Sequence, residues 1–153
     1  MAKRRVVLTG LGTVNPLGRD VPSFWRALLA GESGIRHIQR FDPSQFASRI
    51  GGEVQEWKGV ESDLVDPREM KRMDRFTQFA VQAAIEAVAD SGIDFSQDDP
   101  TRCGVIVGSG IGGLQTLQEQ HRRQLDKGPS RVSPFTVPQL MANAAAGNIS
   151  IIW

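Results

Sequence analysis

The sequence predicts an α/β fold with a mainly parallel sheet and packed helices. Two observations support this prediction: short apolar runs alternate with helical patterns along the chain, and glycine turns separate many of them. In chain order we expect a strand ending at Gly10, a helix through Leu29, a short strand around 50–54, a helix over 75–91, a strand over 103–107 and a helix over 114–125. The length of 153 residues corresponds to one domain, residues 1–153.

The chain opens with a strand, a loop and a helix. The run RRVVLTGLG combines β-branched residues with a glycine turn, which is typical of a short strand and the loop that follows it. Asp20 and Pro22 then predict the start of a helix that runs to Leu29, and Gly31 predicts its end. Residues 31–50 are expected to be a loop.

A second helix start is marked by Asp66 at the N-cap, Pro67 at the first helical position and Glu69 at the third. Apolar residues then recur at helical spacing over 75–91, and Gly92 predicts the end of that helix. The members of this stripe are Phe76, Phe79, Ala80, Ala83, Ala84, Ala87 and Val88. Because the alanines let a helix lie close to a sheet, we expect this helix to be central and largely buried.

Composition excludes several classes of function. With 40% apolar residues, 23% charged residues and a net charge of +1, the chain shows no global preference for nucleic acid or a membrane surface. The single cysteine, Cys103, and the two histidines, His37 and His121, show no spacing typical of a metal site, so we expect no metal and no cofactor. The basic run ending at Arg5 leads directly into the first strand rather than into a signal peptide, which favours the cytoplasm.

Two glycine patterns raise the alternative of nucleotide binding. Gly108, Gly110 and Gly113 have the spacing G-x-G-x-x-G between a predicted strand and a predicted helix. However, the prolines that follow do not suit the second strand that a dinucleotide fold needs, so we do not favour this function. Near the N-terminus, Gly10 and Gly12 are better explained by a tight turn into a packed helix.

Five segments resemble one family in order and in spacing. They are VVLTGLGTVNPLG, FWRALLAGESGI followed by RFDPS, KRMDRFTQFAVQAAIEAVADSGI, CGVIVGSGIGGL and SPFTVPQLMANAAAGNISI. Together they resemble the elongating β-ketoacyl-acyl-carrier-protein synthases of type II fatty-acid synthesis, and less closely the related polyketide ketosynthases. The resemblance implies a partial thiolase-like fold, here an incomplete N-terminal half, in a protein that condenses acyl thioesters with malonyl-carrier protein by decarboxylative Claisen condensation.

The resemblance also implies that the catalytic residues lie outside these 153 residues. The family uses a nucleophilic cysteine at a helix N-terminus, two histidines and a lysine, all of which follow the equivalent of residues 150–153. We therefore expect no catalytic residue here and no activity from this chain alone. Cys103 is not a substitute, because it begins a predicted strand, where a small apolar side chain suits the interior of a sheet, and it is expected to be structural. His37 and His121 are expected to be solvated.

An acyl pocket and a carrier-protein surface are implied by the same resemblance. Ile111 matches the side chain that gates the acyl tunnel, and Phe135 matches a segment that contributes to the partner subunit's pocket in the family homodimer. Thr136 stands where the family has a second aromatic residue, which leaves the preferred acyl chain length open.

Four basic positions match the docking face for the acidic acyl carrier protein. They are Arg68, Lys71, Arg72 and Arg131. The first three lie within little more than one helical turn and can share a face, although an ordinary solvated surface would show the same pattern.

Other functions stay open at this point. The chain could belong to a truncated or split synthase, or it could be a non-catalytic module that binds the carrier protein or a full-length synthase. The sequence does not distinguish fatty-acid from polyketide synthesis.

Overall fold

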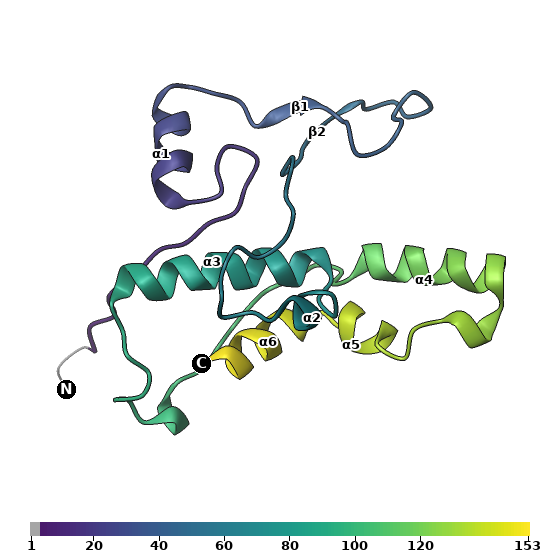
Figure 1. Cartoon of the computed structure of the whole chain (residues 1–153). Helices are drawn as coiled ribbons and strands as arrows, with labels where there is room; N and C mark the ends of the chain where they lie inside the picture. The colour runs from purple at the N-terminus through teal and green to yellow at the C-terminus, as the bar shows by residue number, and fades with distance from the viewer. Residues whose placement is uncertain (1–3) are drawn as a thin grey trace. The chain divides into compact units, whose positions relative to one another are not determined.

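The computed structural model describes residues 4–153, which form two compact units (Figure 1). The first unit combines the residues up to Lys58 with Ala83–Ile93, and the second combines Gly59–Gln82 with Asp94–Trp153. The division falls within the long helix α3 (Arg75–Ser91), so each half of this helix packs with a different part of the sequence.

In the first unit, α1 (Val21–Leu29) precedes a small antiparallel sheet of β1 (Ile35–His37) and β2 (Ile50–Gly52). The predicted first helix is confirmed. The Asp20 carboxylate accepts a hydrogen bond of 2.6 Å from the Ser23 amide, and this backbone bond, with a smaller contribution from the Ser23 side chain, lowers the pKa of Asp20. Gly31 follows with a φ of 72°, which suits a helix end.

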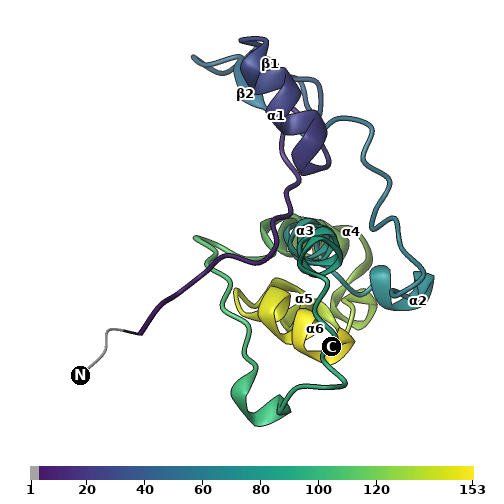
Figure 2. The ribbon, with the colours of Figure 1, turned by 90° about the vertical axis from the view of Figure 1, so that its left-hand side faces the viewer.

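Backbone close to the N-terminus lies directly against the second half of α3 (Figure 2). A Cβ atom added to Gly12 would lie 1.9 Å from the Ala83 carbonyl oxygen, and one added to Gly10 would lie 2.1 Å from that of Ala87. The glycines and the alanine stripe therefore allow backbone to pack on backbone. The Glu86 carboxylate adds a polar link, because it accepts from the Thr13 amide at 2.8 Å.

The second unit is helical. Its elements are α2 (Pro67–Met70), the first half of α3, the 3₁₀ turns η1 (Pro100–Arg102) and η2 (Pro129–Arg131), α4 (Leu114–Lys127), α5 (Thr136–Leu140) and α6 (Ala144–Ile152). After η2 the chain returns so that α5 contacts α4, and α6 contacts α5 (Figure 1). The buried apolar side chains of this unit are Val65, Met73, Val81, Ala145 and Ile149. Within residues 4–153, no helix has the length and apolar character needed to cross a bilayer.

Two predicted strands do not form. The segment that ends at Gly10 and residues 103–107 have no strand structure, and their side chains are largely exposed, with Val6 at 91% and Ile106 at 100%. The described residues contain one sheet, and it is antiparallel and two-stranded, so the predicted mainly parallel sheet is absent from this part of the chain. An apolar segment becomes a strand only when neighbouring backbone supplies hydrogen-bond partners, and residues 4–153 place none beside these two segments.

The predicted helix over 75–91 has the expected bounds, and Gly92 follows it with a φ of 64°. Its burial is lower than predicted: Thr77 and Val81 are buried, whereas most of the stripe is half-buried. The predicted strand around 50–54 is present as β2, while β1 falls in a stretch expected to be a loop.

Candidate functional site

The second unit gathers most of the predicted site residues around a short turn, residues 71–74, that joins α2 to α3. Asp66 caps α2 by accepting a 2.6 Å hydrogen bond from the Arg68 amide, as the sequence predicts. The helix then ends after Met70. Arg68, Lys71 and Arg72 are all exposed, but only Arg68 lies within the helix itself.

Arg72 and Phe135 come together in the structure. The Arg72 guanidinium lies 4.6 Å from the centre of the Phe135 ring and also donates to the Glu69 carboxylate at 2.8 Å. Beside this contact, the Gln139 side-chain amide donates to the Lys71 carbonyl at 3.1 Å. A residue expected at the carrier-protein surface is thus in direct contact with one expected at the acyl pocket, which the sequence pattern did not predict.

Asp74 is a further polar residue of this turn and was missed by the sequence analysis. It is 6% exposed, and its Oδ2 atom accepts from both the amide of Thr116, at 2.8 Å, and the hydroxyl of the same residue, at 2.6 Å. Its Oδ1 atom accepts from the Phe76 amide at 3.3 Å, at the start of α3. The signal was an aspartate directly before a helical stripe, which is an N-cap pattern.

Ile111 lies in the glycine-rich segment 108–113, which leads into α4. Ile111 is 70% exposed. The Gly113 amide donates to the Leu140 carbonyl at 2.9 Å, and the Gly112 amide donates to the Ser109 hydroxyl at 3.0 Å. Since these amides, like that of Thr116, are bonded within the protein, they are not available in this arrangement to hold a phosphate, which argues against the nucleotide-binding alternative.

Thr136 departs from the aromatic residue expected after Phe135, and the structure gives it a local role. Its hydroxyl donates to the Ser133 carbonyl at 2.6 Å, at the first residue of α5. Phe135 itself is 40% exposed. A hydroxyl at position 136 therefore favours the turn into α5 and fills less space than an aromatic ring.

Arg131 lies in a second basic region, at the end of α4. It lines an open hollow together with Arg123 and Lys127 of α4 and with residues 130 and 132–134. Arg123 and Lys127 were not singled out for docking from sequence. Their charges gather here because the chain reverses through η2 and brings Arg131 back toward the last turns of α4.

Cys103 and the two histidines are exposed. The expectation of a Cys103 buried in a sheet was wrong, because residues 103–107 pair with no strand. The Cys103 thiol lies 3.5 Å from the Asp99 carbonyl oxygen, to which it donates. The expectation that His37 and His121 are solvated is confirmed. In residues 4–153, no three metal-ligating side chains come together in a possible metal site.

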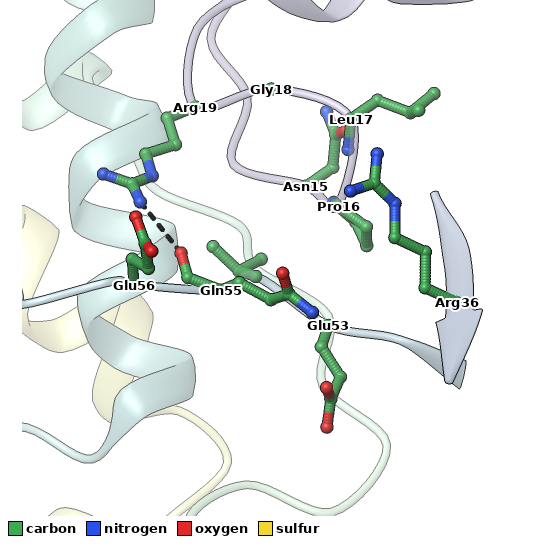
Figure 3. A pocket seen from close by; sticks show the side chains of 10 residues that line it. Asn15, Pro16, Leu17, Gly18, Arg19, Arg36, Glu53, Gln55 and Glu56 are labelled. Atoms are coloured by element: carbon green, nitrogen blue, oxygen red, sulfur yellow. Dashed lines mark hydrogen bonds between the residues drawn. The ribbon is translucent and has the colours of Figure 1, made fainter. Parts of the chain in front are cut away.

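The first unit contains a hollow of its own, about 340 Å³ in volume, between the turn 15–19 and residues 53–56 (Figure 3). Arg19 closes one side by donating to the Gln55 carbonyl at 2.8 Å, while the Arg36 side chain points toward the turn. The Glu53 carboxylate is directed away and accepts from the Gln39 amide at 2.9 Å. The lining residues include no cysteine or histidine and none of the predicted site residues.

Known proteins match the chain over nearly its entire length. A 3-oxoacyl-[acyl-carrier-protein] synthase 2 from Vibrio cholerae is 44% identical over 153 residues, which cover 99% of this chain and 36% of that protein. Among solved structures, a β-ketoacyl synthase from Burkholderia phymatum aligns with a TM-score of 0.78 at 28% identity, covering 99% of this chain and 37% of that one.

A type II polyketide ketosynthase, solved in complex with its acyl-carrier protein, has the same fold over 98% of this chain and 39% of its own, with a TM-score of 0.73 at 22% identity. The chain thus spans about a third of the length of the curated relatives it matches. The sequence model of the β-ketoacyl synthase N-terminal domain matches residues 3–153. The chain therefore belongs to the β-ketoacyl synthase family and corresponds to its N-terminal domain.

Proposed function

We propose that this chain is the N-terminal part of an elongating 3-oxoacyl-acyl-carrier-protein synthase of fatty-acid synthesis. The observation that carries the proposal is the 44% identity to a 3-oxoacyl-[acyl-carrier-protein] synthase 2 over 99% of the chain. The reaction would join an acyl group, held as a thioester, to malonyl-carrier protein with loss of carbon dioxide. The nucleophile and its helpers would come from outside these 153 residues, while this part would supply acyl-pocket and docking residues.

A fusion protein tests this function. Residues 4–153 would replace the matching third of the Vibrio cholerae relative, and the product would be assayed for carbon dioxide release from malonyl-carrier protein and for 3-oxoacyl-carrier protein. We expect condensation that depends on an acyl donor. The matched controls are the unaltered relative and the fusion with its nucleophilic cysteine replaced by alanine. A folded fusion that does not condense, beside an active relative, would contradict the proposal.

The same proposal assigns Ile111 and Phe135 to the acyl pocket. Its support is the position of Ile111 within the glycine-rich segment and the contact of Phe135 with the basic turn at Arg72. Ile111→Ala in the fusion removes volume at the pocket entrance, so we expect the preference to move toward bulkier acyl donors. An unchanged preference in a folded variant would remove Ile111 from the pocket.

For the carrier protein, we propose a docking surface formed by Arg68, Lys71, Arg72 and Arg131. These cations are exposed, and they complement an acidic partner electrostatically. Reversing Arg68 and Lys71 to glutamate should lower the association rate with acyl carrier protein about tenfold at low salt, with a smaller difference at high salt. Arg36→Glu, an exposed cation of the first unit, is the control and should leave binding unchanged.

The exposed cations also support a second candidate, a carrier-binding module without catalysis. The distinguishing result is tight binding of acyl carrier protein by the 153-residue chain together with an inactive fusion.

The proposal of a synthase also includes three expectations from the family resemblance. They are the mainly parallel sheet of a thiolase-like fold, a homodimer and a cytoplasmic location. For the sheet, the support is the pair of unpaired apolar segments that end at Gly10 and span 103–107.

A further inference from the structure

Helix α4 begins without a capping side chain of its own. The residue at its N-cap is Gly113, which has no side chain to accept a hydrogen bond from the first turn. Asp74, 42 positions before Thr116 in sequence, supplies the missing acceptor: its Oδ2 bonds the Thr116 amide at 2.8 Å and the Thr116 hydroxyl at 2.6 Å. One carboxylate therefore serves the starts of two helices, because its Oδ1 also accepts from the Phe76 amide in α3.

The surroundings of Asp74 leave little room for adjustment. Asp74 and Thr116 are 6% and 7% exposed, so water cannot readily replace their hydrogen bonds. A Cβ atom added to Gly113 would lie 3.0 Å from Asp74 Oδ2 and 2.7 Å from the Gln139 carbonyl oxygen. The end of the glycine-rich segment is thus fixed between the turn 71–74 on one side and α5 on the other.

We propose that Asp74 is a positioning residue that holds Ile111 at a defined place relative to the basic turn carrying Lys71 and Arg72. The proposal rests on the function proposed above, in which Ile111 borders the acyl chain and the basic turn receives the carrier protein. Asp74 touches neither partner. It would set the distance between the point where the carrier docks and the point where its acyl chain enters.

Hydrogen exchange on the 153-residue chain tests the structural step without any assumption about function. In Asp74→Asn, the amides of residues 113–117 should exchange about tenfold faster, because a charge-assisted acceptor is lost, while those of α1 keep their rates. Thr116→Val and Thr116→Ser form a matched pair. Valine removes the hydroxyl and should raise the exchange rates, whereas serine retains a hydroxyl and should keep the rates of the unsubstituted chain. If Asp74→Asn does not fold, this pair tests whether the hydrogen bond to Asp74 protects the start of α4.

The functional step is tested in the fusion protein by the ratio of kcat/KM for long and short acyl donors. Asp74→Asn and Thr116→Val should shift this ratio about threefold toward unity, and Thr116→Ser should restore it, with the KM for carrier protein unchanged. A general loss of stability would lower both rates together and leave the ratio intact.

Unchanged exchange in Asp74→Asn and Thr116→Val overturns the positioning role. If hydrogen exchange changes but the ratio of kcat/KM for long and short acyl donors does not, Asp74 positions α4 without influencing acyl specificity, and the proposed effect on specificity is overturned. An inactive fusion whose exchange pattern responds as expected overturns the proposed function and, with it, the specificity extension, while the contact between Asp74 and α4 stands.

Discussion

The two glycine-rich segments of this chain share a sequence pattern but have different surroundings. At Gly10 and Gly12, the backbone lies against α3 so closely that an added Cβ would overlap main-chain atoms. At residues 108–113 the pattern is divided: Gly108 and Gly110 have nothing within 4 Å of an added Cβ, whereas Gly112 and Gly113 lie against the end of α5. Glycine spacing alone therefore does not distinguish a packed crossing from an open loop.

The largest effect is expected from Gly12→Ala. The new Cβ would lie 1.9 Å from the Ala83 carbonyl oxygen, so the segment must move away from α3 and loses its packing there. We expect a loss of about 3 kcal/mol in the free energy of unfolding, measured by urea titration followed by the circular dichroism of the helices. A loss below about 0.5 kcal/mol would show that this crossing is not close-packed in solution.

Gly112→Ala should have a slightly smaller effect, on the second unit. Gly112 has a φ of 79°, and its added Cβ would lie 2.3 Å from the Leu140 carbonyl oxygen, so both the backbone conformation and the contact with α5 oppose alanine. We expect about 2 kcal/mol of destabilisation, with faster hydrogen exchange in α4 and α5. Equal stability to the unsubstituted chain would mean that the segment is as open at 112 as at 110.

A small pH dependence of stability is expected where the first glycine segment leads into α1, because Asp20 is exposed and solvent screens its interactions. The bond from the Ser23 amide lowers the pKa of Asp20, so the charged form stabilises the folded state above the unfolded-state pKa near 3.8, and this contribution is lost as the pH falls through the lower folded-state value. Asp20→Asn should cap the helix without this acid dependence. The measurement is helicity and unfolding free energy between pH 6 and pH 2.5, and identical profiles for the two proteins would contradict the assignment.

The smallest effect is expected from Gly110→Ala. Nothing lies within 4 Å of an added Cβ, and the φ of this residue is outside the left-handed region. Alanine should therefore leave stability unchanged or raise it by about 0.5 kcal/mol, because it reduces the freedom of the unfolded chain. Gly108→Ala serves as a second open position, and a loss above about 1 kcal/mol at either site would show that the loop packs against something.

The sequence determined the local elements, because their signals are local. Asp20 and Asp66 mark helix starts because their carboxylates accept hydrogen bonds from backbone amides two or three residues later, and Gly31 marks a helix end because it adopts a positive φ. The apolar period over 75–91 placed α3 at its observed bounds. The family was also accessible from five ordered segments, since the chain is matched along nearly its whole length.

The tertiary structure decided what depends on residues distant in sequence. The apolar segments around Val6 and Ile106 have strand composition, but a strand needs a neighbour to supply hydrogen bonds, and residues 4–153 place none beside them. The bond from Thr116 to Asp74 and the contact of Arg72 with Phe135 join positions more than 40 residues apart, which no local pattern encodes. Local free energies fix where helices begin and end; the mutual placement of the site residues follows only from which backbone and side chains meet when the chain packs.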